Sequence, residues 1–410
     1  MCIRLFTPGH GKIMDTLICH GLAYLLSTHG YEGEVIPMDR RYLIELREEP
    51  DWQLIVNRLV EDLMEALEYY DTINRLIKER QIAIKNRDRD REFEKVLRAY
   101  MNTEGGRLHI AVESQGVINA RKSVQKLRRI LEKLSSLNPN LSSVYTEDHV
   151  LRYGEGRSKI VSAARRTVRV KKVKVEKYTA PLPIIGFAGK YMTGLYEYAS
   201  DSLKICHWDL ALSWLGLCRS AAVLREGRGD GISIILLRPI APSTPLSEIH
   251  LAQSFALGGQ TQTSLPLAAA VLFSILRVGE IPELEEEIGR VLETIASSRW
   301  SVIAYRFEKQ QPRRPYAIRR ISEYPAFRLL QFLKESRRKS INLYGIARIL
   351  MQNGDLDVLE LMAESIIYGN LDGFANSIKA AFTSLSLSAK ENTRLLKEEL
   401  AELAIKLFST

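Results

Sequence analysis

The residues best suited to chemistry in this chain are the cations of residues 157–177, which hold nine Lys and Arg side chains and one acid, Glu176. From residue 168 to residue 175, valines alternate with cations. This is the two-residue period of a β-strand, whose successive side chains point to opposite faces, and valine suits such a half-buried surface. The pair Lys171 and Lys172 shifts the alternation by one residue, as a β-bulge would. One face can therefore pack on a core while the other presents a row of cations.

A row of cations repels itself, and the phosphate backbone of a nucleic acid would neutralise it. We therefore predict phosphate contacts at seven positions: Arg165, Arg166, Arg169, Lys171, Lys172, Lys174 and Lys177. The alternative is a solvated edge strand whose lysines only discourage aggregation.

A second basic group lies between Arg306 and Tyr324, where arginines are interleaved with tyrosine and phenylalanine. Arginine beside aromatic rings suits both backbone contact and base stacking. Pro312 and Pro315 predict a loop here. The predicted nucleic-acid contacts in this loop are Arg313, Arg314, Arg319 and Arg320. An arginine-rich connector between domains explains the same residues equally well.

Acid–base or metal chemistry has few candidates in the sequence. His10, His20 and His29 lie near the N-terminus with Asp15, but Asp15 and His20 are five residues apart and do not share one helical face. The sequence contains no HExxH, CxxC or GxSxG motif, and residues 9–12 (GHGK) lack the first glycine and the Ser or Thr of a phosphate-binding loop. We therefore expect a binding subunit with no catalytic residue, no metal ligand and no cofactor.

Composition agrees with a soluble globular protein. The 410 residues include 46% hydrophobic and 26% charged residues, with a formal net charge of +9. Residues 157–177 alone carry +8, from nine cations and one acid, so the basicity is local. Cys206 and Cys218 lie in an apolar helical pattern that also holds His207 and Asp209, and we expect buried thiols and a structural histidine there. With no signal-peptide pattern and no apolar run long enough to span a bilayer, we expect a cytoplasmic protein.

The elements that must position these residues predict an α+β fold. Strands are expected at residues 3–6, 232–237 and 300–307, and helices at 14–26, 51–78, 117–137 and 201–224. After residue 325 only helical periods remain, near 325–336, 341–352, 355–368, 371–383 and 388–408. We divide the chain into a mainly helical N-terminal region (1–150), an α/β region with basic strands (151–322) and a C-terminal helical bundle (323–410).

Residues 3–26, IRLFTPGHGKIMDTLICHGLAYLL, contain the segment Asp15-Thr16-Leu17 through His20-Gly21-Leu22. Together with a basic, β-rich middle region and a helical C-terminus, this stretch resembles the Csa family, the large subunit of the archaeal subtype I-A CRISPR interference complex (Cascade). The resemblance implies a non-catalytic subunit of an antiviral defence complex. Its partners would be guide RNA, target DNA, the other subunits of the complex and a helicase-nuclease. Binding to a membrane is not expected. The subunit would help to recognise target DNA beside the guide-paired region, where protein reads a short flanking motif and base pairing reads the sequence.

Two other functions remain open. One is a CRISPR-associated or RNA-processing nuclease that uses His10, His20 or His29. The other is a purely structural assembly protein that contacts only protein.

Overall fold

The computed structural model describes residues 3–39, 41–85, 91–113, 117–134, 140–149, 177–179, 204–227, 231–256, 258–261, 263–277, 285–295, 300–309, 316–339 and 341–385. The chain forms two compact units and passes between them several times. The first unit contains Met1–Val223, Pro242–Gly259 and Phe307–Ile318, and the second contains Leu224–Ala241, Gln260–Arg306 and Arg319–Thr410. Helices and sheets occur together, which confirms the α+β prediction. The boundaries after residues 150 and 322 stay a prediction.

The first unit contains a small antiparallel sheet in the order β1-β3-β2-β8. Its strands are β1 (Ile3–Phe6), β2 (Gly33–Pro37), β3 (Tyr42–Leu46) and β8 (Thr244–Pro245). Ile44 of β3 lies between Leu5 and Val35, and all three side chains are fully buried. The strand predicted at residues 3–6 is confirmed, whereas β2 and β3 were not predicted.

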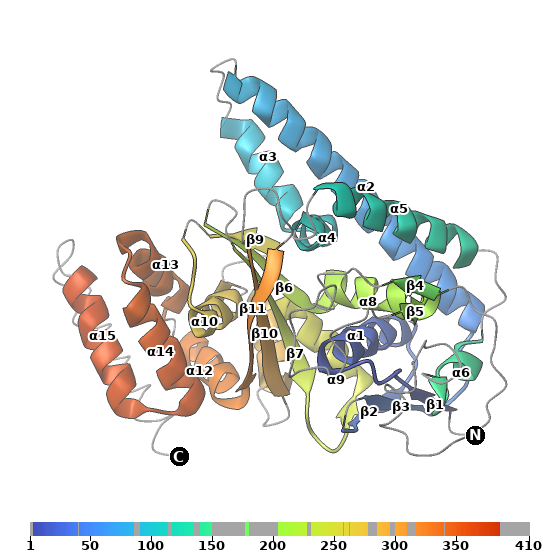
Figure 1. Ribbon diagram of the computed structural model, residues 1–410. Helices are drawn as coiled ribbons and strands as arrows, with labels where there is room; N and C mark the ends of the chain where they lie inside the picture. The colour runs from blue at the N-terminus through green and yellow to red at the C-terminus, as the bar shows by residue number, and fades with distance from the viewer. Residues whose placement is uncertain are drawn as a thin grey trace. The chain divides into compact units, whose positions relative to one another are not determined.

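Helices make up most of the described residues of the first unit (Figure 1). They are α1 (Lys12–Thr28), α2 (Trp52–Lys85), α3 (Arg91–Met101), α4 (Glu104–Glu113), α5 (Val117–Leu134), α6 (Leu141–Val144), α8 (His207–Ser220), α9 (Leu246–Ala252) and the 3₁₀ turn η2 (Gln253–Phe255). Asp51 begins α2 as predicted, because its Oδ1 accepts hydrogen bonds from the backbone N–H groups of Gln53 and Leu54.

The apolar run at 201–224 was predicted as one helix, and this prediction is wrong at both ends. Lys204–Cys206 is a strand, β5, paired with β4 (Lys177–Thr179). The helix α8 ends at Ser220, and the chain continues directly as β6 (Ala221–Glu226). The residues of β6 are apolar enough for either structure, so the sheet they enter decides the conformation.

The second unit is built around a five-stranded sheet in the order β11-β10-β7-β6-β9. In addition to β6 its strands are β7 (Gly231–Pro239), β9 (Gly258–Gln260), β10 (Trp300–Lys309) and β11 (Tyr316–Pro325), so the strands predicted at 232–237 and 300–307 are confirmed. The loop prediction fails for residues 316–325, which form β11 after Pro315. Proline is tolerated just before a strand, and the alternating residues of β11 then pair with β10.

Helices cover the sheet of the second unit. They are α10 (Leu267–Arg277), α11 (Glu285–Ile295), α12 (Phe327–Arg338), α13 (Leu343–Asn353), α14 (Leu356–Tyr368) and α15 (Leu371–Leu385). In Figure 1, α10 and α12 lie beside the sheet, and α13, α14 and α15 form an outer layer. Four of the five C-terminal helices are therefore confirmed, and the fifth, predicted near 388–408, lies outside the described residues. Within the described parts of the chain, no helix has both the length and the apolar character needed to cross a bilayer.

Candidate functional site

The predicted basic strand cannot be placed, because most of it lies outside the described residues. This holds for six predicted phosphate contacts: Arg165, Arg166, Arg169, Lys171, Lys172 and Lys174. Lys177 is the first residue of β4, where its backbone is paired with Cys206 of β5.

The structure describes only some residues of the second basic group. Arg313 and Arg314 lie outside the described residues, whereas Arg319 and Arg320 belong to β11, and the Arg320 side chain is exposed. Arg306 has a structural role instead, because it pairs with the buried Glu226 at 3.2 Å and donates to the Leu265 carbonyl at 2.6 Å. The described member of this group that is available to a ligand is therefore Arg320.

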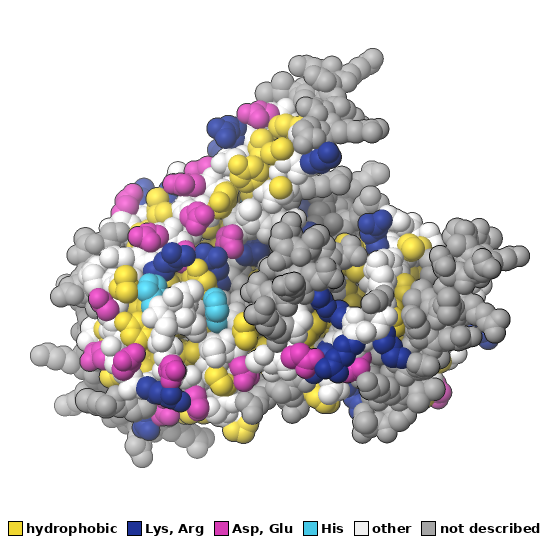
Figure 2. Space-filling model, turned by 180° about the vertical axis from the view of Figure 1, so that it is seen from behind, with side chains coloured by type: hydrophobic (Ala, Val, Ile, Leu, Met, Phe, Trp, Pro, Cys, Tyr) yellow, Lys and Arg dark blue, Asp and Glu magenta, His cyan; other side chains and the backbone are white. Residues whose placement is uncertain are grey.

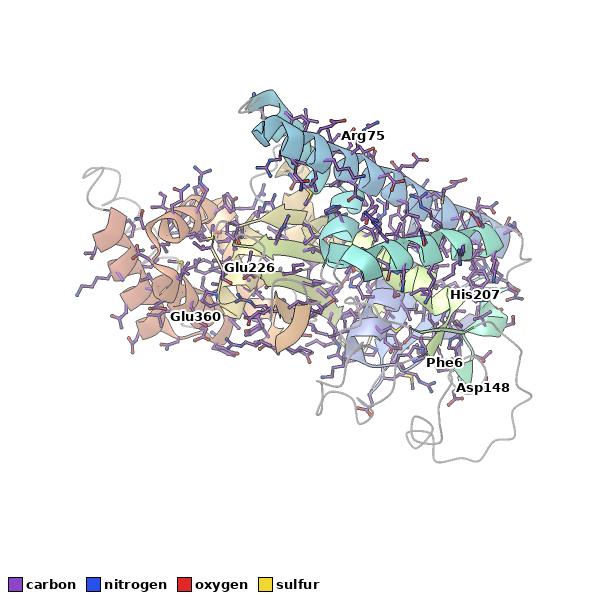
Figure 3. The ribbon with its side chains drawn as sticks, turned by 45° about the horizontal axis from the view of Figure 1, so that its top comes forward. Phe6, Arg75, Asp148, His207, Glu226 and Glu360 are labelled. Carbon is purple, nitrogen blue, oxygen red and sulfur yellow. The ribbon has the colours of Figure 1, made fainter. Side chains whose placement is uncertain are left out.

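Charges of both signs are mixed on one face of the described surface and along α2. On the face drawn in Figure 2, Lys and Arg side chains stand among Asp and Glu side chains. The helix α2, whose outer half carries Arg75 (Figure 3), shows the same mixing, with Arg75, Lys78 and Arg80 following Glu65, Glu68 and Asp71. Such surfaces are typical of solvated helices and differ from the one-signed tract at 157–177.

The N-terminal histidines do not form one site. His10 is in the loop before α1, His20 lies in the middle of α1, and His29 caps its C-terminal end. His20 and His29 are about 13 Å apart along the helix axis, at 1.5 Å per residue. The His20 side chain is fully buried, with Gln253 donating to its backbone carbonyl at 2.9 Å.

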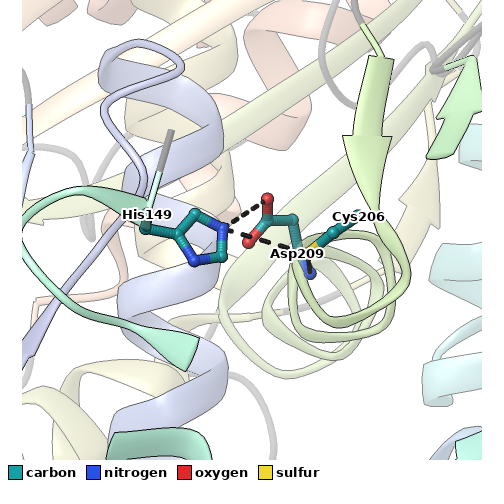
Figure 4. A group of neighbouring side chains, drawn as sticks. All are labelled: His149, Cys206 and Asp209. Atoms are coloured by element: carbon teal, nitrogen blue, oxygen red, sulfur yellow. Dashed lines mark hydrogen bonds and ion pairs between the residues drawn. The ribbon is translucent and has the colours of Figure 1, made fainter. Parts of the chain in front are cut away.

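His10 instead belongs to a buried cluster centred on Asp209. The Asp209 Oδ2 atom lies 3.0 Å from His10 Nε2 and 3.0 Å from His149 Nε2, and Asp209 Oδ1 accepts a hydrogen bond from the Tyr145 hydroxyl at 3.0 Å. The Cys206 Sγ atom lies 3.9 Å from His149 Nε2 (Figure 4). The side chains of His10 and His149 are 1% exposed and that of Asp209 is fully buried.

Three segments far apart in the sequence meet at this cluster. Phe6, Asp148 and His207, labelled in Figure 3, mark the strand β1, the turn after α6 and the start of α8 at this end of the first unit. The backbone N–H of Phe6 donates to the Tyr145 carbonyl at 2.7 Å, which ties the first two segments together. Tyr145 and His149 also stack, with ring centroids 4.8 Å apart.

Asp15 holds the conformation of the loop that contains His10. Its carboxylate accepts hydrogen bonds from the backbone N–H groups of Gly9 at 2.7 Å and Gly11 at 2.8 Å. Both glycines have positive φ angles, 81° and 130°, a backbone conformation that residues with a side chain rarely adopt. Asp15 is therefore committed to holding this turn, and burial raises the pKa of its carboxyl group.

The crossing of α1 and α8 places the Asp209 end of α8 beside this loop. A Cβ atom on Gly216 would lie 1.9 Å from the Leu17 carbonyl oxygen, and one on Gly21 would lie 2.5 Å from the Leu212 carbonyl oxygen. Glycine at both positions therefore allows the two helix backbones to touch.

Hydrogen bonding defines the protonation of His149. Its Nδ1 faces the Val144 carbonyl at 2.7 Å and its Nε2 faces the Asp209 carboxylate, and both of these oxygens are acceptors. With no other group bound, both ring nitrogens must carry protons, so His149 is an imidazolium paired with Asp209. Burial alone would lower the pKa of His149, but the charge and hydrogen bond of Asp209 raise it.

The same charges and burial shift the pKa values of the other groups in the cluster. Burial alone would raise the pKa of Asp209, but His149 and His10 hold it well below its usual range. Burial, with Asp209 beside it, raises the pKa of the Cys206 thiol well above its ordinary value, and the same two causes raise that of Tyr145. The side chains of Tyr145, His149, Cys206 and Asp209 are all buried.

The buried thiol of Cys206 was predicted from the sequence, whereas the cluster around Asp209 was not. His207 was predicted to be a core histidine, but it is half-buried against the Trp208 ring, whereas its neighbour Asp209 is fully buried. One signal was available, since Cys206-x-x-Asp209 places two ligand-type side chains at the first turn of a helix. Nothing local to the sequence connects that turn to His10 or His149.

Comparison with known proteins assigns the family. A family model described as CRISPR-associated protein (Cas_Csa4) matches residues 3–403. The chain is 23% identical over 375 residues to the CRISPR-associated protein Cas8a2/Csa4 of Methanocaldococcus jannaschii, covering 87% of this chain and 82% of the relative. It is 28% identical over 214 residues to the CRISPR system associated protein Cas8 of Thermoproteus tenax, covering 52% of this chain and 50% of the relative.

The family resemblance inferred from residues 3–26 is therefore confirmed over nearly the whole length. The chain belongs to the CRISPR-associated Csa4 (Cas8a2) family, consistent with the large subunit of a type I-A complex.

Proposed function

We propose that this chain is the non-catalytic large subunit of a CRISPR RNA-guided interference complex. In this function it contacts nucleic-acid backbone, helps to recognise target DNA beside the guide-paired region, and recruits a helicase-nuclease. The observation that carries the proposal is the cation tract at 157–177, nine cations and one acid, in a chain of this family. Guide pairing reads the target sequence in such complexes, so the protein needs mainly backbone contacts and a short flanking readout.

The buried positions of the N-terminal candidates support a non-catalytic role. A nuclease would need His10, His20 or His29 open to a phosphodiester, whereas His10 and His20 are buried and the half-buried His29 has its Nδ1 2.8 Å from the Leu25 carbonyl oxygen. Asp15 is already committed to the loop N–H groups and His10 to Asp209. The proposal therefore predicts that the purified chain does not cleave RNA or DNA with any divalent metal, and metal-dependent cleavage that His20→Ala abolishes would contradict it.

The tract should act on phosphate in a way that does not depend on sequence. Lysine is a point charge with no bidentate donor geometry, so Lys171, Lys172 and Lys174 should position the duplex without reading bases. Each phosphate contact contributes about −0.9 to the slope of log affinity against log salt. Replacing all three lysines by alanine should therefore flatten the slope by up to about 3 and weaken all target sequences alike.

The test is a salt titration of target-DNA binding by the assembled complex. A charge-matched control replaces Arg75, Lys78 and Arg80, which stand on the mixed-charge surface of α2, by alanine. The control should leave the slope unchanged. An unchanged slope and affinity in the Lys171/Lys172/Lys174 variant would favour a purely structural assembly protein.

Contacts to neighbouring subunits should involve the outer helices of the second unit. Leu361 and Tyr368 are seven residues apart on α14, two turns along one face, and are 40% and 59% exposed. Replacing both by serine should weaken assembly of the complex, measured by co-purification, without changing the salt slope of DNA binding. A change in slope with intact assembly would show that this face contacts nucleic acid instead.

A further inference from the structure

The buried cluster around Asp209 has the composition of a metal site. His149 Nε2, Cys206 Sγ and an Asp209 carboxylate oxygen all lie within 4.8 Å of one another, and all three residues are buried (Figure 4). Imidazole, thiolate and carboxylate are the three ligand types of protein-bound zinc. A second imidazole lies beside this group, because His10 Nε2 is 3.0 Å from an Asp209 carboxylate oxygen.

We propose that His149, Cys206, Asp209 and His10 bind one structural zinc ion. The inference does not depend on the proposed function, because it rests on the donor atoms alone.

The distances between donor atoms fit such an ion. With bonds of about 2.0–2.3 Å in a tetrahedron, neighbouring donor atoms should be about 3.3–3.6 Å apart. The Asp209–His149 distance is 3.0 Å and the Cys206–His149 distance is 3.9 Å, which lie on either side of that value. These two distances from His149 Nε2 therefore each differ by about 0.3 Å from the spacing of a tetrahedral site.

Two of the four proposed ligands, His149 and Asp209, have the surrounding hydrogen bonds expected of ligands, whereas His10 Nδ1 is buried without a hydrogen-bond partner among the described residues. Metal-bound histidines almost always donate their second ring N–H to a carbonyl or carboxylate, and bound carboxylates are themselves hydrogen-bonded. His149 Nδ1 faces the Val144 carbonyl at 2.7 Å, and Asp209 Oδ1 accepts from the Tyr145 hydroxyl at 3.0 Å. Both ligands are thus already oriented by their neighbours.

A divalent cation also changes the electrostatics of the cluster. It allows His149 to be neutral, because the Nε2 lone pair binds the metal while Nδ1 keeps its proton for Val144. A coordinating thiol loses its proton outright, so Cys206 would contribute a thiolate despite its burial. The ion would join the loop before α1, the turn after α6 and the N-terminus of α8, which are otherwise separated by up to 199 residues.

The test is the metal content of the full-length chain, purified without chelators or nickel resin and measured by plasma mass spectrometry. We expect one zinc per chain. Cobalt exchanged into the wild-type protein should give the thiolate-to-cobalt absorption band of a cysteine-ligated tetrahedral site. This measurement needs no variant, so it decides the proposal even if ligand variants fail to fold.

Variants then assign the ligands. Cys206→Ser should remove the thiolate band, whereas Cys218→Ser, which changes a buried thiol inside the helix α8 that Cys206 caps, should keep both the band and the zinc. Tyr145→Phe, which removes only the hydrogen bond to Asp209, should weaken zinc about 10- to 100-fold in competition with a chelator. Wild-type protein with neither zinc nor a cobalt–thiolate band would overturn the proposal, as would zinc retained equally by Cys206→Ser.

Discussion

The crossing of α1 and α8 depends on one glycine, and Gly216→Ala tests it directly. The new Cβ would lie 1.9 Å from the Leu17 carbonyl oxygen and 2.6 Å from the Leu17 carbonyl carbon, whereas ordinary contact begins at 3.4 Å. The two backbones must therefore move apart by about 1.5 Å, the difference between 3.4 and 1.9 Å. Backbone cannot rotate out of the way as a flexible side chain would.

The cost follows from the packing of these helices. Overpacking a core typically costs about 1–3 kcal/mol. This case belongs at the upper end, because a separation of the helices also loses dispersion contacts along the whole crossing. Alanine recovers about 1 kcal/mol through its helix propensity. We therefore expect a net loss of about 2 kcal/mol in the free energy of unfolding.

Urea unfolding followed by tryptophan fluorescence is the assay, since Trp208 and Trp214 are buried on α8 itself. Gly289→Ala in α11 is the control, because a Cβ atom there would meet nothing within 4 Å. This variant should raise the free energy of unfolding by about 0.5–1 kcal/mol, since alanine favours the helix more than glycine does. If Gly216→Ala were as stable as the wild type, α1 and α8 would not be in backbone contact. The placement of His10 beside Asp209 would then lose its structural basis.

The remaining predictions concern single hydrogen-bonding groups of the first unit. Arg107, which is buried, donates to the Cys218 carbonyl at 2.6 Å and the Ala256 carbonyl at 2.7 Å and pairs with Glu104 at 3.1 Å. Arg107→Ala should cost about 3–5 kcal/mol in urea unfolding, and Arg107→Lys should recover only part of it because one ammonium cannot reach all these acceptors. Full recovery by lysine would show that charge alone matters. Asp51→Ala should cost about 1 kcal/mol by removing the cap of α2, and Asp51→Asn should restore most of it, as measured by the same titration. Equal losses in both Asp51 variants would mean that the cap contributes little.

Local signals in the sequence were enough to predict most helices. The three- to four-residue spacing of Ile55, Leu59 and Leu63 predicts α2, and Asp51 marks its start, because capping and amphipathic burial act within a few residues. The C-terminal helices follow for the same reason, since glycines such as Gly354 and Gly369 end them in left-handed conformations. The cation tract at 157–177 is likewise visible without a structure, because charge is a property of composition.

Tertiary structure decided the outcomes that depend on partners distant in the chain. The apolar residues of β6 suit a helix or a strand, and only the neighbouring strands of the sheet select the strand. Arg319 and Arg320 lie in a strand and not in the predicted loop, because pairing of β11 with β10 holds the backbone at these residues in an extended conformation.

The cluster of His10, His149, Cys206 and Asp209 depends most on the tertiary structure. Taken one at a time, these residues have the sequence surroundings of ordinary core or loop residues. A set of metal ligands is defined by the distances between its side chains, and spacing along the chain does not reveal those distances. The glycines at the α1–α8 crossing and the loop held by Asp15 bring these side chains to within 3–4 Å of Asp209 or of one another. That proximity is a product of packing, and no local period in the sequence encodes it.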